Sequence, residues 1–339
     1  MHADEIRQKV MGYTQGTALL NIAYIGIVNR LFEKLAKTGP LTASDLAQQA
    51  GVDKGYVVRW CDTGYAFDLL DETDDGLFSL TEAGHMFLPD VPGTLMPFAV
   101  GAVLGTHMAE RAAGLMPGGE RPGEKVLGER GTVLPWFGPM LEKMFGPFLD
   151  NEIIPNVPVY QEVDARGGLA VDLGCGNGWY LRTLARRLPQ LRAIGLDGFG
   201  ENIRQANAMA EAEAMAGRVS FREGDIYNFS IDEKADLIAM NRALHHVWDQ
   251  KEKVFSILAK HLKDDGVVII WEPNWPVMRS RLREPDKRMM AFQNLSEHVQ
   301  GNHFLRPEEI ADQFRAVGLE PEVYLFGNDR ESVVVGRKA

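Results

Sequence analysis

The chain has 339 residues, of which 45% are hydrophobic and 24% charged, and it carries a formal net charge of −11. This length allows two domains of ordinary size, and the acidic balance disfavours a protein that binds the phosphate backbone of nucleic acids. Polar residues interrupt the apolar stretches, and no basic segment precedes an apolar one at the N-terminus, so we expect neither a membrane span nor a secretory signal. The two cysteines, Cys61 and Cys175, lack metal-ligand spacing, and we expect reduced thiols and a cytoplasmic protein.

Residues 1–90 predict helices followed by a small hairpin. A helix is expected to follow Thr42 and to end before Gly51, and helical periodicity resumes over residues 52–70. Asp74-Asp75-Gly76 is a strong hairpin-turn signal, and the order helix, turn, helix, hairpin is typical of a winged helix. The second helix and the wing are acidic, and the segment over residues 16–36 is apolar on more than one face. We therefore expect a dimerisation domain of a homodimer and not a DNA-binding module.

Residues 91–165 alternate loop-forming and helix-forming segments. Glycine and proline cluster over residues 116–125, which predicts a loop. Apolar and aromatic stretches that begin near Trp136 follow, punctuated by prolines. We expect a helical linker that covers the active site, with Trp136 as one candidate substrate contact and core packing as the alternative.

Residues 166–339 alternate between strand and helix patterns. Strands are expected over residues 168–173, 191–197, 219–225, 235–241 and 266–272, with helices between most of them. This order predicts an α/β fold with a doubly wound, mostly parallel Rossmann-like sheet. Two last strands joined through Gly327, Asn328 and Asp329 predict an antiparallel hairpin at the end of the sheet.

A glycine-rich loop follows the first of these strands, in the sequence VDLGCGNGWY from Val171 to Tyr180. Glycines let the backbone approach a ligand closely at the carboxyl end of a strand. The order G-x-G-x-G differs from the G-x-G-x-x-G of dinucleotide-binding loops. Asp172, Asp197 and Asp225 end or follow the first three strands, and such acids suit an adenosine ligand with a sulfonium better than a pyrophosphate.

In VDLGCGNGWY, IGLDGF and EGDIYNF the chain resembles the class I S-adenosylmethionine-dependent methyltransferases, and with its N-terminal module it resembles their small-molecule O-methyltransferase branch. The resemblance implies S-adenosylmethionine as cofactor, S-adenosylhomocysteine as product, and a small-molecule substrate. It also implies cofactor contacts from Asp172, Gly174, Gly176, Gly178, Asp197, Gly198, Asp225, Ile226 and Asn241.

Three chemistries remain open for the acceptor. In the O-methyltransferase branch a histidine after the fourth strand removes the hydroxyl proton, and His245 or His246 resembles it. The chain also resembles 2-oxo acid C-methyltransferases, in which two histidines hold a metal. There His245 and His298 match, with His303 as a further candidate ligand, although this chain has His246 where that family has an acid.

The third chemistry is S-methylation of a thioether, which needs no base. Aromatic faces such as those of Trp136 and Trp275 stabilise a sulfonium product, and Arg281 is a candidate for the substrate carboxylate. In length and in the run of its sequence the chain looks similar to the methylthiohydroxybutyrate S-methyltransferases of dimethylsulfoniopropionate synthesis. We therefore take 4-methylthio-2-hydroxybutyrate as the leading substrate, with an adenosylmethionine-binding regulator as the non-enzyme alternative.

Overall fold

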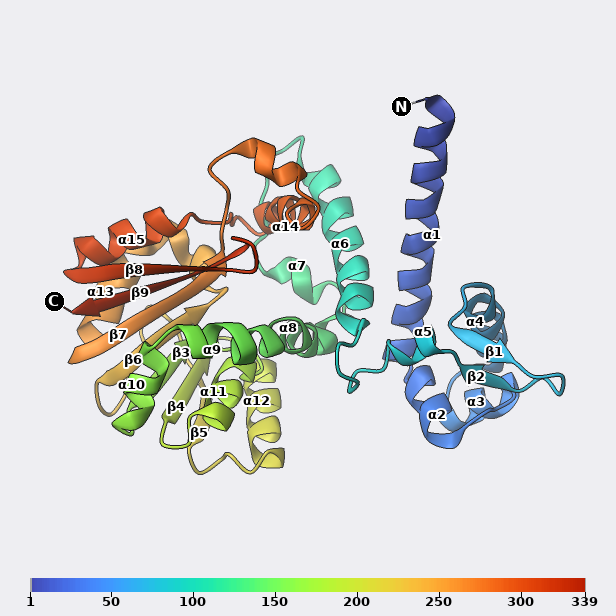
Figure 1. The fold of residues 1–339 in the computed structure, drawn as a ribbon, viewed down its shortest axis with the longest axis horizontal. Coiled ribbons are helices and arrows are strands. Elements are labelled where there is room, and N and C mark those ends of the chain that lie inside the picture. Colours follow the sequence, from blue (N-terminus) through green and yellow to red (C-terminus); the bar gives the residue numbers. More distant parts are fainter. Residues whose placement is uncertain (1, 339) are drawn as a thin grey trace. The chain divides into compact units, whose positions relative to one another are not determined.

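The computed structural model describes residues 2–338, and the chain divides into two compact units (Figure 1). One unit holds the residues up to 110 together with residues 130–143, and the other holds residues 111–129 together with those from 144 onward. Residues 91–165, which we expected as one linker, are thus shared between the two units. Among residues 2–338, no helix combines the length and the apolar character that a membrane crossing requires.

The N-terminal unit is mainly helical, as predicted. In chain order its elements are α1 (Ala3–Val28), α2 (Leu31–Thr38), α3 (Ala43–Ala50), α4 (Lys54–Ala66), β1 (Leu70–Glu72), β2 (Phe78–Leu80), α5 (Glu82–His85), most of α6 (Met96–Leu115) and the first part of α8 (Leu134–Phe148). Side-chain caps start two of the helices, because Thr42 accepts a hydrogen bond from the backbone amide of Asp45 and Asp53 accepts one from that of Tyr56.

The helix predicted over residues 52–70 ends earlier, at Ala66. Asp68 has a left-handed backbone with φ of 55°, which a helix does not tolerate. The chain then enters β1, and Leu70 pairs with Leu80 across the hairpin. The predicted turn lies between the two strands, where Gly76 has φ of 74°.

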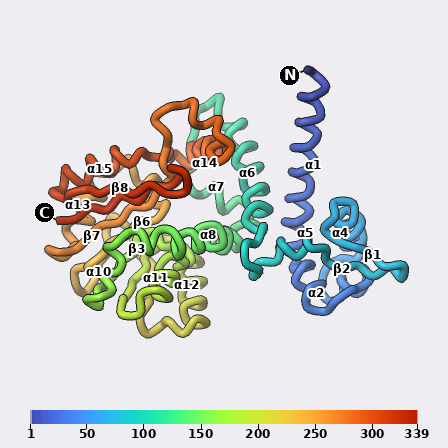
Figure 2. Tube along the Cα trace, in the orientation of Figure 1, coloured from blue at the N-terminus to red at the C-terminus, as the bar shows by residue number. Residues whose placement is uncertain are grey.

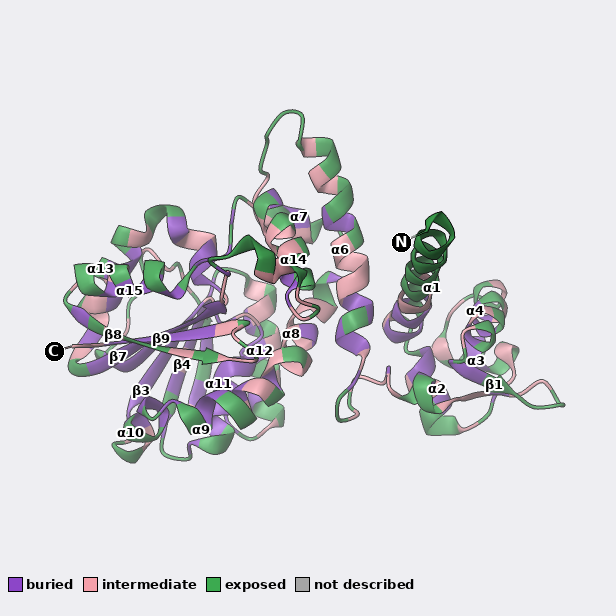
Figure 3. Ribbon diagram, turned by 45° about the horizontal axis from the view of Figure 1, so that its top comes forward, coloured by how far each residue is buried: buried purple, intermediate pink, exposed green. Residues whose placement is uncertain are grey.

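The first half of α1 is exposed along its whole length. Four of its larger apolar residues, Ile6, Val10, Met11 and Tyr13, are each about half exposed or more. Its last turns are buried instead, with Ile22, Ala23 and Ile27 in the core of the N-terminal unit (Figure 3). One end of the helix therefore belongs to a packed core, and the other has no apolar partner among the described residues.

The second unit contains a seven-stranded sheet. Its strands are β3 (Leu169–Leu173), β4 (Arg192–Asp197), β5 (Val219–Glu223), β6 (Ala235–Asn241), β7 (Leu262–Pro273), β8 (Leu319–Phe326) and β9 (Glu331–Lys338). Its helices include α7 (Lys125–Gly128), η1 (Leu149–Ile153), α9 (Ile154–Asn156), α10 (Val159–Ala165), α11 (Trp179–Arg187), α12 (Gly200–Ala212), η2 (Leu244–Gln250), α13 (Lys251–His261), η3 (Arg279–Arg283), α14 (Arg288–Val299) and α15 (Pro307–Ala316).

The strand order is β5-β4-β3-β6-β7-β9-β8. The five strands from β5 to β7 are parallel to one another, whereas β9 is antiparallel to both β7 and β8. The prediction of a doubly wound sheet with a terminal antiparallel hairpin is confirmed. The order reverses direction at β3 and β6, and in open α/β sheets ligands bind outside the carboxyl ends of the strands at this point.

Apolar residues of the central strands and of the helices that cover them form the core of this unit. All five residues of β3 are buried, and Phe255 of α13 packs edge-on against Phe314 of α15 with their ring centroids 5.1 Å apart. A sheet covered on both faces gives continuous apolar strands, which Figure 3 shows as buried ribbons. The polar side chains that matter for function therefore gather at the strand ends.

One short segment of this unit comes from far away in the sequence. The trace in Figure 2 brings α7 beside α14, although about 160 residues separate them. A hydrogen bond of 3.2 Å from Arg121 to the Nε2 atom of His298 joins the two segments. Residues 111–129 thus contact α14 of the sheet-containing unit.

Candidate functional site

The glycine loop begins where β3 ends. Gly174, Gly176 and Gly178 all have positive φ, at 75°, 54° and 76°, a conformation that side chains disfavour. A Cβ atom at Gly178 would lie 2.4 Å from the ring of Phe221. Three glycines thus let a bare backbone turn closely at the carboxyl edge of the sheet, where α11 begins.

Asp197 ends β4 and holds this loop in place. Its carboxylate accepts hydrogen bonds from the backbone amide of Gly176 at 2.8 Å, from that of Phe199 at 2.9 Å, and from the side chain of Asn202 at 3.1 Å. Three donors, two from loops and one from α12, therefore converge on one buried carboxylate. The predicted residue does lie beside the glycine loop, and it also organises that loop.

Asp172 is only 1% exposed, and its Oδ1 atom accepts a 2.8 Å hydrogen bond from Asn241 at the end of β6. Burial raises the pKa of the Asp172 carboxyl well above its usual value, against the lowering effect of this hydrogen bond. Nearby, the Oδ1 atom of the buried Asn177 has no hydrogen-bond partner among the described residues. A buried polar atom without a partner is costly unless a ligand or water satisfies it.

The remaining predicted cofactor residues lie at the same edge. Gly198 is exposed directly after β4, with open space around the position of a Cβ atom. Asp225 and Ile226 follow β5, and Asp225 accepts a hydrogen bond from the backbone amide of Tyr227 at 2.9 Å. The ends of β3, β4 and β5 therefore present a backbone cradle and three carboxylates. This arrangement suits an adenosine ligand and fits S-adenosylmethionine.

A second polar cluster lies at the ends of β6 and β7. His245, in η2, is 5% exposed, and its Nδ1 atom lies 2.7 Å from the Oε2 atom of Glu272 at the end of β7. The other oxygen of Glu272 accepts hydrogen bonds from the backbone amides of Leu244 and His245. Because Glu272 is fully buried and binds both the ring and the backbone, the orientation of His245 is fixed.

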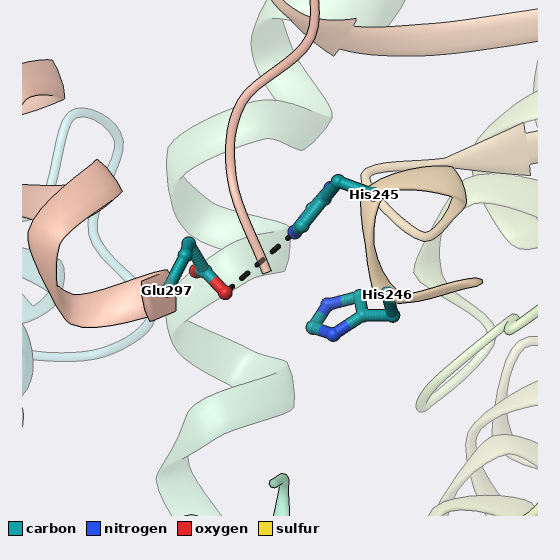
Figure 4. Close-up of side chains that lie close together, drawn as sticks. All are labelled: His245, His246 and Glu297. Atoms are coloured by element: carbon teal, nitrogen blue, oxygen red, sulfur yellow. Dashed lines mark ion pairs between the residues drawn. The ribbon is translucent and has the colours of Figure 1, made fainter. Parts of the chain in front are cut away.

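The other ring nitrogen of His245 faces a second carboxylate. Its Nε2 atom lies 3.7 Å from the Oε2 atom of Glu297 on α14, and the neighbouring ring of His246 is 4.2 Å away between centroids (Figure 4). Burial alone would lower the pKa of His245, but Glu272 and Glu297 together raise it to about 10. In the absence of other ligands His245 therefore carries a proton at neutral pH.

His246 has two partners at one ring nitrogen. Its Nδ1 atom lies 3.0 Å from Glu124, which precedes α7, and 2.7 Å from the amide nitrogen of Asn302. The hydrogen bond with His246 lowers the pKa of Glu124. Burial opposes ionisation of Glu297, yet His245 and His246 hold the pKa of that carboxyl below its usual value. We call His245, His246, Glu124, Glu272 and Glu297 the acceptor cluster.

Several residues that the sequence suggested for the substrate lie elsewhere. His298 is exposed and hydrogen-bonded to Arg121, and His303 is exposed. The side chains in residues 2–338 that converge as metal ligands are His245, His246 and Glu297, with one ligand atom of each within 4.8 Å of the others. This set includes neither His298 nor His303. His298 is left out because α14 directs Glu297, and not the adjacent histidine, toward His245.

The other candidates differ in their closeness to the cluster. Trp136 packs against the core of the N-terminal unit, and Arg281 is paired with Glu284 and Asp329. Trp275 lies nearer, since its ring is 6.4 Å from that of Phe304, which is 5.8 Å from the ring of His245. Of these three, Trp275 alone is linked to the cluster through a described contact.

Sequence reasoning missed three carboxylates of the acceptor cluster. Glu272 could have been found, because it ends a strongly apolar strand at the same sheet edge as Asp172 and Asp197. Glu124 and Glu297 carried no such signal, since each lies in a polar segment far from His245 in sequence. Only the fold brings them together.

Comparison with known proteins identifies the central part of the chain. Residues 170–266 match the model of a methyltransferase domain family, and these residues carry the glycine loop, Asp197 and the histidine pair. The chain therefore carries a methyltransferase domain. It is similar to the O-methyltransferase SfmM3 of Streptomyces lavendulae, with 25% identity over 78% of each chain.

Other curated relatives share only part of their length with this chain. The chain covers 32% of an uncharacterised 37.1 kDa protein in a Streptomyces fradiae transposon and 36% of a trans-aconitate 2-methyltransferase from Streptomyces avermitilis, at 34% and 36% identity over 33% and 30% of this chain. These matches support the methyltransferase domain without extending to the whole proteins.

Solved structures resemble the whole fold. An O-methyltransferase family protein from Burkholderia thailandensis aligns with a TM-score of 0.73 at 18% identity, over 100% of this chain and 99% of the other. Human N-acetylserotonin methyltransferase in complex with S-adenosylmethionine aligns over both whole chains with a TM-score of 0.71 at 17% identity. At such low identity the likeness establishes the fold, and the substrate has to be argued from the site.

Proposed function

We propose that the methyltransferase domain transfers the methyl group of S-adenosylmethionine to an acceptor atom of a small molecule, and that His245 removes no proton from this atom. Our specific candidate is the thioether sulfur of 4-methylthio-2-hydroxybutyrate. The bound cofactor supplies an electrophilic methyl group on a sulfonium. The residues that would hold it are the glycine loop, Asp197 and the side chains at the ends of β3, β5 and β6.

The surroundings of His245 carry this proposal. A general base needs a free lone pair directed at the acceptor. In His245, Nδ1 is hydrogen-bonded to Glu272 and Nε2 faces Glu297. With a pKa of about 10 the ring holds its proton at neutral pH, so His245 is poorly suited to take a proton from a hydroxyl group.

A thioether has no proton to remove, and its methylation creates a positive charge. The acceptor cluster contains three carboxylates and two imidazoles, so its net charge stays negative even if both rings are protonated. Negative surroundings stabilise a developing sulfonium. The likeness of the chain's length and sequence to the methylthiohydroxybutyrate S-methyltransferases points to the particular thioether.

O-methylation is the second candidate, and one contact favours it. The 2.7 Å contact between His245 and Glu272 is the arrangement that orients a histidine base in many enzymes, and a relative with matching coverage bears the name O-methyltransferase. In that case Glu297 would have to move away from Nε2 when the substrate binds. C-methylation of a 2-oxo acid remains a further alternative for the same site.

The two candidates predict different responses to pH and to loss of His245. We would supply S-adenosylmethionine with 4-methylthio-2-hydroxybutyrate, a catechol or a 2-oxo acid, and follow S-adenosylhomocysteine formation from pH 6 to pH 10. We expect turnover of the thioether, with little dependence on pH and a modest loss in His245→Gln. If a hydroxyl is the true acceptor, the rate should rise toward pH 10, and His245→Gln should lose about 10²–10⁴-fold.

Retained affinity of His245→Gln for S-adenosylmethionine, measured by calorimetry, would show that the variant is folded. Turnover of the catechol alone, with the pH dependence of a base, would replace the proposed reaction by O-methylation. Cofactor binding without turnover of any acceptor would favour a regulator that binds S-adenosylmethionine.

We also propose that the N-terminal unit, a winged-helix-like module, pairs two copies of the chain. The exposed apolar residues Ile6, Val10, Met11 and Tyr13 on α1 support this proposal, because a contiguous exposed apolar surface commonly marks an interface. Light scattering at micromolar concentration should give twice the 37.7 kDa mass of the chain. Ile6→Asp together with Val10→Asp should yield monomers, whereas a monomeric wild-type protein would exclude this role for α1.

A further inference from the structure

We infer that His245, His246 and Glu297 form a binding site for one divalent transition-metal ion such as Zn²⁺, Fe²⁺ or Co²⁺. One ligand atom from each residue lies within 4.8 Å of the others. Two of the three come from η2 and the third from α14 (Figure 4), so the ion would join two elements that are about 50 residues apart. This inference concerns binding and does not depend on the identity of the methyl acceptor.

The spacing between His245 and Glu297 fits two ligands of one ion better than a direct hydrogen bond. The Nε2 and Oε2 atoms are 3.7 Å apart, which exceeds normal hydrogen-bond lengths. Ligand atoms bound at about 2.1 Å in tetrahedral geometry lie about 3.4 Å from each other. A small movement of the Glu297 side chain would therefore place both atoms on a common ion.

The environment of His245 gives independent support. Histidines that bind metals almost always donate their other ring N–H to a carboxylate, a backbone carbonyl or water, which fixes the tautomer. Glu272 occupies that position at 2.7 Å, is fully buried, and is itself held by the backbone amides of Leu244 and His245. Nε2 is therefore directed at the point where His246 and Glu297 converge.

His246 also has a carboxylate beside one ring nitrogen, which can accept the N–H of that nitrogen when it is protonated. Glu124 and Asn302 both contact its Nδ1 atom, at 3.0 Å and 2.7 Å. With both imidazoles neutral, the three carboxylates of the cluster leave a charge of −3, and a divalent ion would reduce it to −1. Binding of the ion would displace the proton from His245, so the two compete for the same lone pair.

The donor set selects the class of metal. Two imidazoles and one carboxylate suit zinc and the other late divalent ions of the first transition row, whereas calcium and magnesium prefer oxygen ligands. Three protein ligands also leave coordination positions for water or for oxygen atoms of a substrate. A metal-bound His245 would have no free lone pair, which agrees with an acceptor that needs no base.

The test is metal binding by the full chain, independent of turnover. After treatment with a chelator and its removal, the protein would be titrated with Co²⁺ and followed by visible absorption, and with Zn²⁺ by calorimetry. We expect one ion per chain. Glu297→Gln and His246→Asn should each weaken binding by at least 10–100-fold, a loss known for changes even in the outer shell of metal sites.

His298→Asn is the matched control, because His298 is the next residue to Glu297 but contacts Arg121. It should bind Co²⁺ like the wild-type protein. S-adenosylmethionine affinity would verify that each variant is folded. The inference is overturned if the wild-type protein binds no Co²⁺ tightly, if Glu297→Gln binds it equally well, or if His298→Asn weakens it as much as Glu297→Gln does. Each outcome is separate from the identity of the acceptor, which turnover reports.

Discussion

At the carboxyl ends of β3 and β4, the carboxylate of Asp197 binds two backbone amides and the side chain of Asn202. At the ends of β6 and β7, carboxylates bind the rings of two histidines. Asp197 holds the glycine loop through the amides of Gly176 and Phe199. In the acceptor cluster, Glu297 and Glu124 reach two histidines from distant segments. A cofactor site built on a backbone loop can serve many proteins that share the fold. A site built from charged side chains can change its chemistry when a few of those side chains change.

The largest effect is expected from Glu272→Ala. The change leaves the ring of His245 and two buried backbone amides without their acceptor, and breaking a buried pair of this kind costs about 3–5 kcal/mol. Urea denaturation should show this loss in the free energy of unfolding. Glu272→Gln keeps an acceptor oxygen and should lose less. Equal stability of Glu272→Ala and the wild-type protein would mean that the cluster does not depend on Glu272.

Two glycine substitutions test how the glycine loop at the cofactor edge depends on its backbone conformation and on its packing. Gly178→Ala combines a positive φ with a Cβ atom 2.4 Å from Phe221, whereas Gly176→Ala has a positive φ but open space. We expect a cost of about 1–2 kcal/mol for the backbone conformation alone and roughly 1–3 kcal/mol more for the overpacking at Gly178. Chemical denaturation of the two variants tests the difference, and equal losses would show that Phe221 moves aside freely.

The same contrast explains what the sequence could predict. The glycine loop, Asp172 and Asp197 lie within 30 residues of one another, and each follows a recognisable strand, so local pattern and sheet topology suffice to place them at one edge. His245 was predictable for the same reason, because it follows β6. The contact of His246 with Glu124 spans more than 100 residues, and no periodicity encodes it.

The geometry of α14 explains why the sequence predicted His298, and not Glu297, beside His245. His298 and Glu297 are adjacent in sequence, so they point in different directions around the helix axis. His298 consequently contacts Arg121, while Glu297 faces His245. Without a prediction of α14 as a helix, the sequence offered no basis for choosing between these two neighbours.

Asp197→Ala should weaken the cofactor site by a smaller amount. Loss of its hydrogen bonds to the amides of Gly176 and Phe199 would loosen the glycine loop and remove a candidate ribose ligand. A charge-assisted hydrogen bond contributes about 1.5–3 kcal/mol, which corresponds to roughly 10–150-fold in the dissociation constant of S-adenosylmethionine. Calorimetry would measure this loss, with Glu297→Gln as the comparison variant that should retain cofactor affinity. Unchanged affinity in Asp197→Ala would remove Asp197 from the cofactor site.

The smallest effect concerns pH and belongs to the acceptor cluster alone. The pKa of His245 is about 10 in the folded chain, whereas the ordinary value of 6.5 applies to the unfolded chain. Between these two pH values the folded state therefore binds more protons than the unfolded state. The stabilisation is complete below pH 6.5 and is lost as the pH rises through 10, with a slope of at most about 1.4 kcal/mol per pH unit. In chelator-treated protein, the free energy of unfolding should therefore fall by about 2 kcal/mol more between pH 7 and pH 8.5 in the wild type than in His245→Gln. Parallel pH profiles would show that His245 is neutral in the folded chain, and the argument against its role as a base would then fail.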